Sequence, residues 1–183
     1  MSIEIVADKY SSAMFELAQE QNKLELIEEQ LGYVASVMDE QPELRWFLKN
    51  PTITNDAKIR LIGTIFESSI DKIALHFIYV MIKRGRDRYI EQAIAAFIKK
   101  SRKARGILDA IVTVAEPITA DVEASVQSKL REVTGKDVIL SVCQDPSIMG
   151  GIIIQVGDKR IDGSISRRLE ELEKSLLRTN SIR

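Results

Sequence analysis

The hydrophobic pattern of this chain changes its period at Gly106. Before that glycine, apolar residues recur at three- and four-residue steps, which is the spacing of one face of an α-helix. After it, short β-branched runs such as ILDAIVTV are bounded by turn residues, which is typical of strands. Aromatic residues follow the same division, because every Phe, Tyr and Trp lies at or before Phe97. The break predicts two domains built on different plans, residues 1–105 and residues 106–183.

The first domain is predicted to be all-α. Pro51 pushes the preceding Asn50 out of the helical region, so one helix ends there. Thr54 or Asn55 then suits the N-cap of the next helix. Because the loops are short, neighbouring helices should be antiparallel, which predicts a six-helix bundle. The expected helices span about residues 3–20, 23–39, 42–49, 55–66, 70–83 and 87–105.

The second domain is predicted to be a small α/β domain with the element order β-α-β-β-β-α. Thr119 can cap its first helix, and Gly135 ends that helix. Ser164 is the expected N-cap of the last helix. The strands are expected in ILDAIVTVAE, DVILSVC, GGIIIQV and KRI. The whole chain therefore belongs to a mixed class, an all-α domain followed by an α/β domain.

The residues that usually carry chemistry are scarce. The single histidine, His76, cannot build a zinc site alone, so we expect it to pack at a helix interface. The single cysteine, Cys143, excludes an internal disulfide and favours a reducing compartment. It lies in a strand pattern and is expected to be buried. No carboxylate pair stands out, no apolar run is long enough to span a bilayer, and no targeting segment is recognisable at the start. We expect no enzyme activity, no metal and no cofactor.

The glycines of IMGGIIIQVGDKRIDGS raise the alternative of a phosphate-binding loop. Such a loop follows a strand and opens a helix, so that free amides meet the anion. Gly150-Gly151 leads into a strand instead, and is expected to mark a bulge or a close backbone approach. Gly157-Asp158 is expected to form a two-residue hairpin turn. Asp162 would repel an anion at the last helix. The glycines are therefore interpreted as turn and junction residues between strands, not as a phosphate-binding loop.

Residues 83–105 form a basic block with nine Lys and Arg against two Asp and Glu. The net charge is −6 before the block and −2 after it. A block of this kind can bind nucleic acid, and this is the alternative function that the sequence leaves open. The competing interpretation is a basic face that complements the acidic residues 1–82 or an acidic partner protein.

Two helices of the first domain carry more apolar surface than a two-sided helix needs. In residues 74–82, Phe77 and Met81 share one face, and other apolar residues cover the remaining sides. Phe15 likewise lies off the main stripe of the first helix. A helix of this kind is either central in the core or shared between the core and a partner. A groove between two such helices would suit an amphipathic partner helix; spacing alone leaves both alternatives open.

The stretch from residue 145 to residue 172 combines a glycine pair, an apolar strand, Gly-Asp, Ile-Asp-Gly-Ser and Arg-Leu in a fixed order. It resembles the C-terminal signature of the delta subunits of bacterial and plastid rotary ATP synthases, relatives of the mitochondrial oligomycin-sensitivity-conferring protein. The first domain agrees more loosely with the family. The matching residues are Tyr10 with FELA (residues 15–18), LKNP (residues 48–51) with Lys58, and Arg84-Gly85-Arg86. One departure is Ser166-Arg167, where the family often has Arg-Gly. The signature residues are Gly150, Gly151, Gly157, Asp162, Gly163, Ser164 and Arg168.

The resemblance implies a non-catalytic stator subunit of the proton-translocating ATP synthase, linking the catalytic head to the peripheral stalk against rotor torque. It implies that the bundle holds the N-terminal helix of an alpha subunit between its first and fifth helices. It implies that the second domain engages the C-terminal region of the b subunit. The expected location is peripheral, on the cytoplasmic face of a bacterial inner membrane or the stromal face of a thylakoid. No nucleic acid is expected, and the membrane is met only through the complex. The expected alpha-binding residues are Tyr10, Met14, Phe77 and Met81. The candidate stalk contacts, which could instead pack on the sheet, are Leu169, Leu172 and Leu176.

Overall fold

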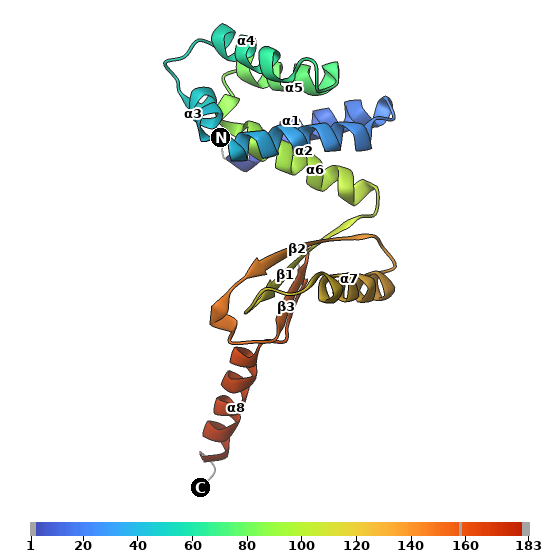
Figure 1. Cartoon of the computed structure of the whole chain (residues 1–183), viewed down its shortest axis with the longest axis vertical. Helices are drawn as coiled ribbons and strands as arrows, with labels where there is room; N and C mark the ends of the chain where they lie inside the picture. The colour runs from blue at the N-terminus through green and yellow to red at the C-terminus, as the bar shows by residue number, and fades with distance from the viewer. Residues whose placement is uncertain (1–2, 158, 181–183) are drawn as a thin grey trace. The chain divides into compact units, whose positions relative to one another are not determined.

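The structure, a computed structural model, describes residues 3–157 and 159–180, and within them the side chains of residues 4–157 and 159–172. The chain divides into two compact units, Met1–Ala104 and Arg105–Arg183. In the described residues, helices alone build the first unit, and a small sheet with helices builds the second (Figure 1). The mixed fold class expected from the sequence is therefore confirmed. The division lies one residue before the expected boundary.

The first unit surrounds one apolar core. Helices α1 and α2 pack against α6, and α4 packs against α5. The core includes the fully buried Ile27, Met81 and Phe97. None of the helices that the structure describes has the length and apolar character needed to cross a bilayer. The elements are α1 (Ile3–Glu20), α2 (Leu24–Glu40), α3 (Pro42–Lys49), α4 (Asn55–Phe66), α5 (Lys72–Lys83), the short 3-10 helix η1 (Asp87–Tyr89) and α6 (Ile90–Ala104).

Side-chain capping explains where α4 and α5 begin. Thr54 Oγ1 accepts a hydrogen bond from Ala57 N at 3.4 Å, so it is the N-cap of α4, as expected. Asp71 Oδ1 accepts one from Ile73 N at 2.9 Å and starts α5 at residue 72, slightly later than the hydrophobic pattern suggested. This backbone hydrogen bond, more than the Lys23 ion pair, lowers the pKa of Asp71.

The second unit holds a four-stranded sheet in the order β2-β1-β3-β4 (Figure 1). β1 and β2 are parallel and are connected through α7, whereas β3 pairs antiparallel with both β1 and β4. Gly157 lies in the turn between β3 and β4, and Asp158 lies outside the described residues. The elements are β1 (Leu108–Val114), α7 (Ala120–Thr134), β2 (Val138–Gln144), the 3-10 helix η2 (Pro146–Ile148), β3 (Ile152–Val156), β4 (Lys159–Asp162) and α8 (Ile165–Asn180).

Helix α7 covers one face of the sheet. Ala110, Leu130 and Val138 form the centre of this small core. On the opposite face, Ile111 and Ile139 are exposed. The sheet is therefore a two-layer structure with one face that α7 leaves open.

Two side chains lie where the sequence interpretation was wrong. Cys143 was expected to be buried but is exposed. The reason is that β2 is an edge strand and Cys143 faces the side opposite α7. His76 was expected to pack at a helix interface but is also exposed, because α5 turns its neighbours Leu75 and Phe77 inward.

Candidate functional site

A close backbone approach joins the start of β3 to the start of α8. Gly151 has a φ of +81°, and a Cβ at this position would meet the carbonyl group of Gly163, whose carbon lies 3.2 Å away. Gly163 N donates to Ile152 O at 2.9 Å, and Ile165 N donates to Gly150 O at 3.0 Å. The close approach expected at the glycine pair is confirmed.

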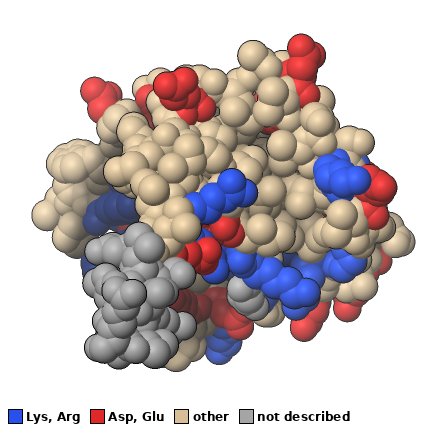
Figure 2. All heavy atoms as spheres, turned by 90° about the horizontal axis from the view of Figure 1, so that it is seen from below, with Lys and Arg blue, Asp and Glu red and all other residues tan. Residues whose placement is uncertain are grey.

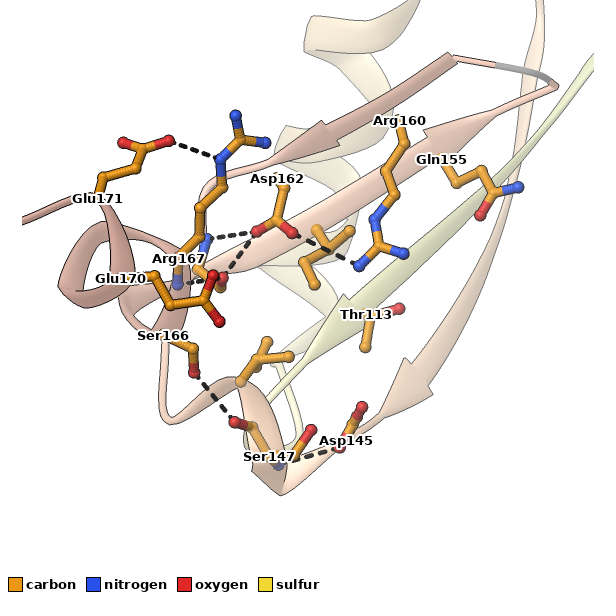
Figure 3. Close-up of a pocket in the computed structure, with 13 residues that line it drawn as sticks. Thr113, Asp145, Ser147, Gln155, Arg160, Asp162, Ser166, Arg167, Glu170 and Glu171 are labelled. Atoms are coloured by element: carbon orange, nitrogen blue, oxygen red, sulfur yellow. Dashed lines mark hydrogen bonds and ion pairs between the residues drawn. The ribbon is translucent and has the colours of Figure 1, made fainter. Parts of the chain in front are cut away.

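Asp162 and Ser164 cap the helix that follows this junction. Ser164 Oγ accepts from Arg167 N at 3.2 Å, so it is the expected N-cap. Asp162 Oδ1 in turn accepts from Ser164 Oγ at 2.7 Å and from Ser164 N at 3.1 Å (Figure 3). These bonds, the hydroxyl first, lower the pKa of Asp162, and the Arg160 guanidinium adds to the effect. The signature residues of this stretch therefore fix the start of α8.

Helix α8 extends away from the sheet instead of packing on it (Figure 1). Its described contacts are concentrated on η2, where Ser166 Oγ donates to Ser147 O at 3.0 Å. Ile165, Leu169 and Leu172 follow the i, i+4, i+7 spacing of one helix face and are 45%, 53% and 60% exposed. Arg168 is exposed beside them. The side chain of Leu176 lies outside the described residues. The described part of α8 thus presents an apolar face to solvent, which we call the α8 face (Ile165, Leu169, Leu172).

A polar hollow of about 580 Å³ lies beside the α8 junction (Figure 3). Two ion pairs lie among its lining residues, Arg160 with Asp162 at 3.5 Å and Arg167 with Glu171 at 2.9 Å. The hydroxyls of Ser164 and Ser166 are occupied by hydrogen bonds, and the unit contains no histidine to activate them. The described residues hold no group of His, Cys, Asp and Glu that could bind a metal ion. The hollow offers no nucleophile with a base and no acid–base couple.

The residues expected to bind an alpha-subunit helix lie in or against the core of the first unit. Met81 is fully buried, and Met14 and Phe77 are 3% and 8% exposed. Tyr10 on α1 is partly buried against the same core. Partner binding at these four positions stays a prediction.

The open apolar surface of the first unit lies at residues that the sequence analysis did not single out. Ile5 on α1 is 58% exposed and lines a shallow hollow with Ala7 and with Ala96 of α6. Trp46 on α3 is 65% exposed. The signal in the sequence was present, since Ile5 departs from the three- and four-residue spacing that marks the buried stripe of α1.

Part of the basic block pairs with the acidic helices α1 and α2. Lys100 Nζ lies 2.8 Å from Asp8 Oδ1 of α1, and Arg102 Nε lies 2.9 Å from Glu28 Oε1 of α2. These contacts support the interpretation that the block complements the acidic helices. On the face drawn in Figure 2, Lys and Arg side chains and Asp and Glu side chains are both visible. Among the described residues, the arginines that form no ion pair around the turn after α5 are Arg84, Arg86 and Arg88.

The family model for the ATP synthase delta (OSCP) subunit matches residues 6–176 of the chain. The chain belongs to the ATP synthase delta (OSCP) subunit family. ATP synthase subunit delta of Alkaliphilus oremlandii is 34% identical over 173 residues, which cover 94% of this chain and 96% of the relative. The corresponding subunit of Picosynechococcus sp. is 31% identical over 176 residues, 96% of this chain and 95% of the relative. A chain of the Toxoplasma gondii mitochondrial ATP synthase hexamer shares the fold, with a TM-score of 0.76 and 22% identity over 97% of this chain and 98% of that chain.

Membership of the delta (OSCP) family makes the chain a non-catalytic subunit of the ATP synthase stator, part of the peripheral stalk. It is accordingly a peripheral component of a membrane-bound complex. The stator function and the resemblance on which it was expected are confirmed. None of the comparisons supports the nucleic-acid alternative.

Proposed function

We propose that this stator subunit uses two separate surfaces, one in each unit. The α8 face binds the C-terminal region of a b subunit, and the helical unit binds the N-terminal helix of an alpha subunit. The observation that carries the proposal is the α8 face itself, because Leu169 and Leu172 project from a helix that leaves the sheet. The subunit would then sit at the cytoplasmic face of a bacterial inner membrane or the stromal face of a thylakoid, touching the membrane only through the complex.

The spacing of the α8 face suits a helical partner. Anchors at i, i+4 and i+7 are the pattern by which one amphipathic helix lies against another. Complete burial of a leucine or isoleucine contributes about 1.5–3 kcal/mol. Because these three side chains are about half exposed in the free chain, covering them contributes several kcal/mol before the cost of association.

In the helical unit, the proposed contact runs along α1 and α5. Among Tyr10, Met14, Phe77 and Met81, Tyr10 offers the most surface, whereas Met14 and Met81 are buried in the core. The exposed Ile5 extends the apolar surface of α1 toward its N-terminal end. A partner helix would therefore gain most from Tyr10 and least from Met81.

Calorimetric titration of the full chain tests both contacts. The ligands are the C-terminal segment of the cognate b subunit and the N-terminal peptide of the cognate alpha subunit. Leu169→Asp and Leu172→Asp should each weaken binding of the b segment at least about tenfold, as for an interface hot spot. Glu171→Ala, on the polar side of α8, is the matched control. Binding of the alpha peptide should be unchanged in all three variants.

Unchanged affinity for the b segment in both leucine variants would refute the stalk contact. Loss of alpha-peptide binding in the same variants would show that the two surfaces are not separate.

A further inference from the structure

The outer side of strand β2 is open in the part of the chain that the structure describes. The sheet order places β2 beside β1 alone. Its seven residues, VILSVCQ, include no charge and no proline. The opposite edge strand, β4, has only four residues, and three of them are charged. Natural sheets protect an edge by shortening or charging it. β4 follows this rule and β2 does not.

Hydrogen bonds at the two ends of the β1–β2 ladder show which main-chain groups face outward. The carbonyl of Asp137 and the amide of Asp145 both bond to β1, at 2.8 Å each, so the odd-numbered residues of β2 face β1. The even-numbered residues face away, because main-chain groups alternate along a strand. The carbonyl of Val138 is already capped by Gln127 Nε2 at 2.7 Å. The N–H and C=O groups left open belong to Leu140, Val142 and Gln144.

We propose that this edge accepts an extended segment of the stalk partner as an added strand. The proposal rests on the stalk contact proposed for the α8 face. The last residues of β2 lead into η2, where Ser147 O accepts the hydrogen bond of Ser166 Oγ from the first turn of α8. From Gln144 to Ser147 the chain spans at most about 11 Å. A partner segment that continues from a helix on the α8 face therefore reaches the open edge.

The side chains of β2 define the chemistry of the added segment. On the α7 side of the sheet, the segment would lie beside the apolar Leu140 and Val142. On the other side it would meet the small Ser141 and Cys143. An uncharged segment rich in β-branched residues, without proline at the bonding positions, fits both sides.

A second copy of this chain is a poorer occupant. The open part of the β2 edge, the five residues from Leu140 to Gln144, extends only about 17 Å. Pairing of two such edges buries much less than the roughly 800 Å² per partner of a stable interface. A segment tethered through the α8 face does not need to bury this much area, because the tether gives it a high effective concentration at the edge.

Hydrogen exchange of the full chain, measured residue by residue by NMR, tests the proposal without any substitution. In the free chain, the amides of Leu140, Val142 and Gln144 should exchange rapidly, whereas those of Ser141 and Cys143 are protected by β1. Saturation with the soluble part of the cognate b subunit should slow the three outward amides at least about tenfold. Rapid exchange of these amides in the saturated complex would overturn the proposal. Protection that appears when the free chain is merely concentrated would also overturn it, since the occupant would then be a second copy.

The variant Val142→Pro separates this proposal from the stalk contact on α8. Proline removes the outward N–H of residue 142 and leaves the β1 ladder intact, so binding of the b subunit should weaken about tenfold. Circular dichroism checks that the variant is folded. Weaker binding in Leu172→Asp, with no effect of Val142→Pro and no amide protection, would overturn the added strand and leave the α8 contact standing. Weaker binding in Val142→Pro alone would support the strand and refute the α8 contact.

Discussion

Gly151 is the position at which one added methyl group should disturb the second unit most. Its φ of +81° lies in the left-handed region, and its Cα faces the backbone of Gly163. Because the obstacle is main chain, it cannot rotate away as a flexible side chain would. Gly151→Ala therefore combines two costs, an unfavourable backbone conformation and a forced separation of β3 from the start of α8.

Gly135 provides a matched control for the first of these costs. It ends α7 with a φ of +65°, and no atom lies within 4 Å of the position of an added Cβ. A left-handed conformation costs an L-residue about 1–2 kcal/mol. Overpacking of a filled site costs a further 1–3 kcal/mol, roughly. We therefore expect the free energy of unfolding to fall by about 2–5 kcal/mol in Gly151→Ala and by about 1–2 kcal/mol in Gly135→Ala.

Urea unfolding of the full chain can assign the loss to the second unit. Every Tyr and Trp lies in the first unit, so fluorescence reports only on that unit. Circular dichroism reports on the helices of both units. With a urea dependence of about 1 kcal/mol per molar for a domain of this size, Gly151→Ala should lower the midpoint of the dichroism transition by about 2 M or more. The fluorescence midpoint should stay where it is.

Equal midpoint shifts in the two glycine variants would refute this reasoning. The close approach to Gly163 would then add nothing to the conformational cost, and the glycine at position 151 would need another explanation. A fluorescence midpoint that moves together with the dichroism midpoint would show that the two units unfold as one. The difference between the shifts of Gly151→Ala and Gly135→Ala would still show whether the close approach to Gly163 adds a cost.

Further substitutions test the first unit and the α8 junction. Lys58→Met leaves Asp87 without its buried partner and should lower the free energy of unfolding, measured by fluorescence, by about 3–5 kcal/mol. Adding Asp87→Leu should recover part of this loss. A double variant that recovers none of it would contradict the ion pair. Met81→Ala, at a fully buried site, should lower the free energy of unfolding in urea by about 2–5 kcal/mol and leave the affinity for the alpha peptide unchanged. Tyr10→Ala should instead weaken binding of the alpha peptide in calorimetry and change the free energy of unfolding little. Because the folded pKa of Asp162 is lowered, its stabilisation is complete above the unfolded value of about 3.9 and is lost as the pH falls through the folded pKa. In Asp162→Asn, the circular dichroism signal should therefore fall less steeply as the pH is lowered below about 4. An unchanged fall would exclude this carboxylate as its source.

Features set by neighbouring residues were predictable from the sequence. Thr54 and Ser164 are N-caps because their hydroxyls reach amides three residues ahead. Gly135 ends α7 in the left-handed conformation that glycine adopts without strain. The glycine pair was expected to mark a close approach, because it leads into a strand and not into a helix.

Features set by distant parts of the chain were not predictable. The pattern of β2 shows which residues share a face, but it does not show that β2 is an edge strand or which face α7 covers, so Cys143 was misplaced. The periodicity of α8 identified the leucine stripe and left open whether Leu169 packs on the sheet. For the same reason, the apolar excess of α5 could not separate a core residue such as Met81 from a groove residue.

Four of the signature residues, Gly151, Asp162, Gly163 and Ser164, act on the direction of α8. Gly151 and Gly163 contribute backbone contact, and Asp162 and Ser164 contribute capping bonds, so none of them supplies an apolar contact. The first turn of α8 is nevertheless tied in three ways, by the close approach, by the bond from Ile165 N to Gly150 O, and by the cap. A stator subunit transmits torque only if its contacts keep their orientation. Added flexibility at this junction would let the α8 face change its orientation relative to the sheet. Substitutions at the junction should therefore weaken coupling to the stalk even where the α8 face itself is unchanged.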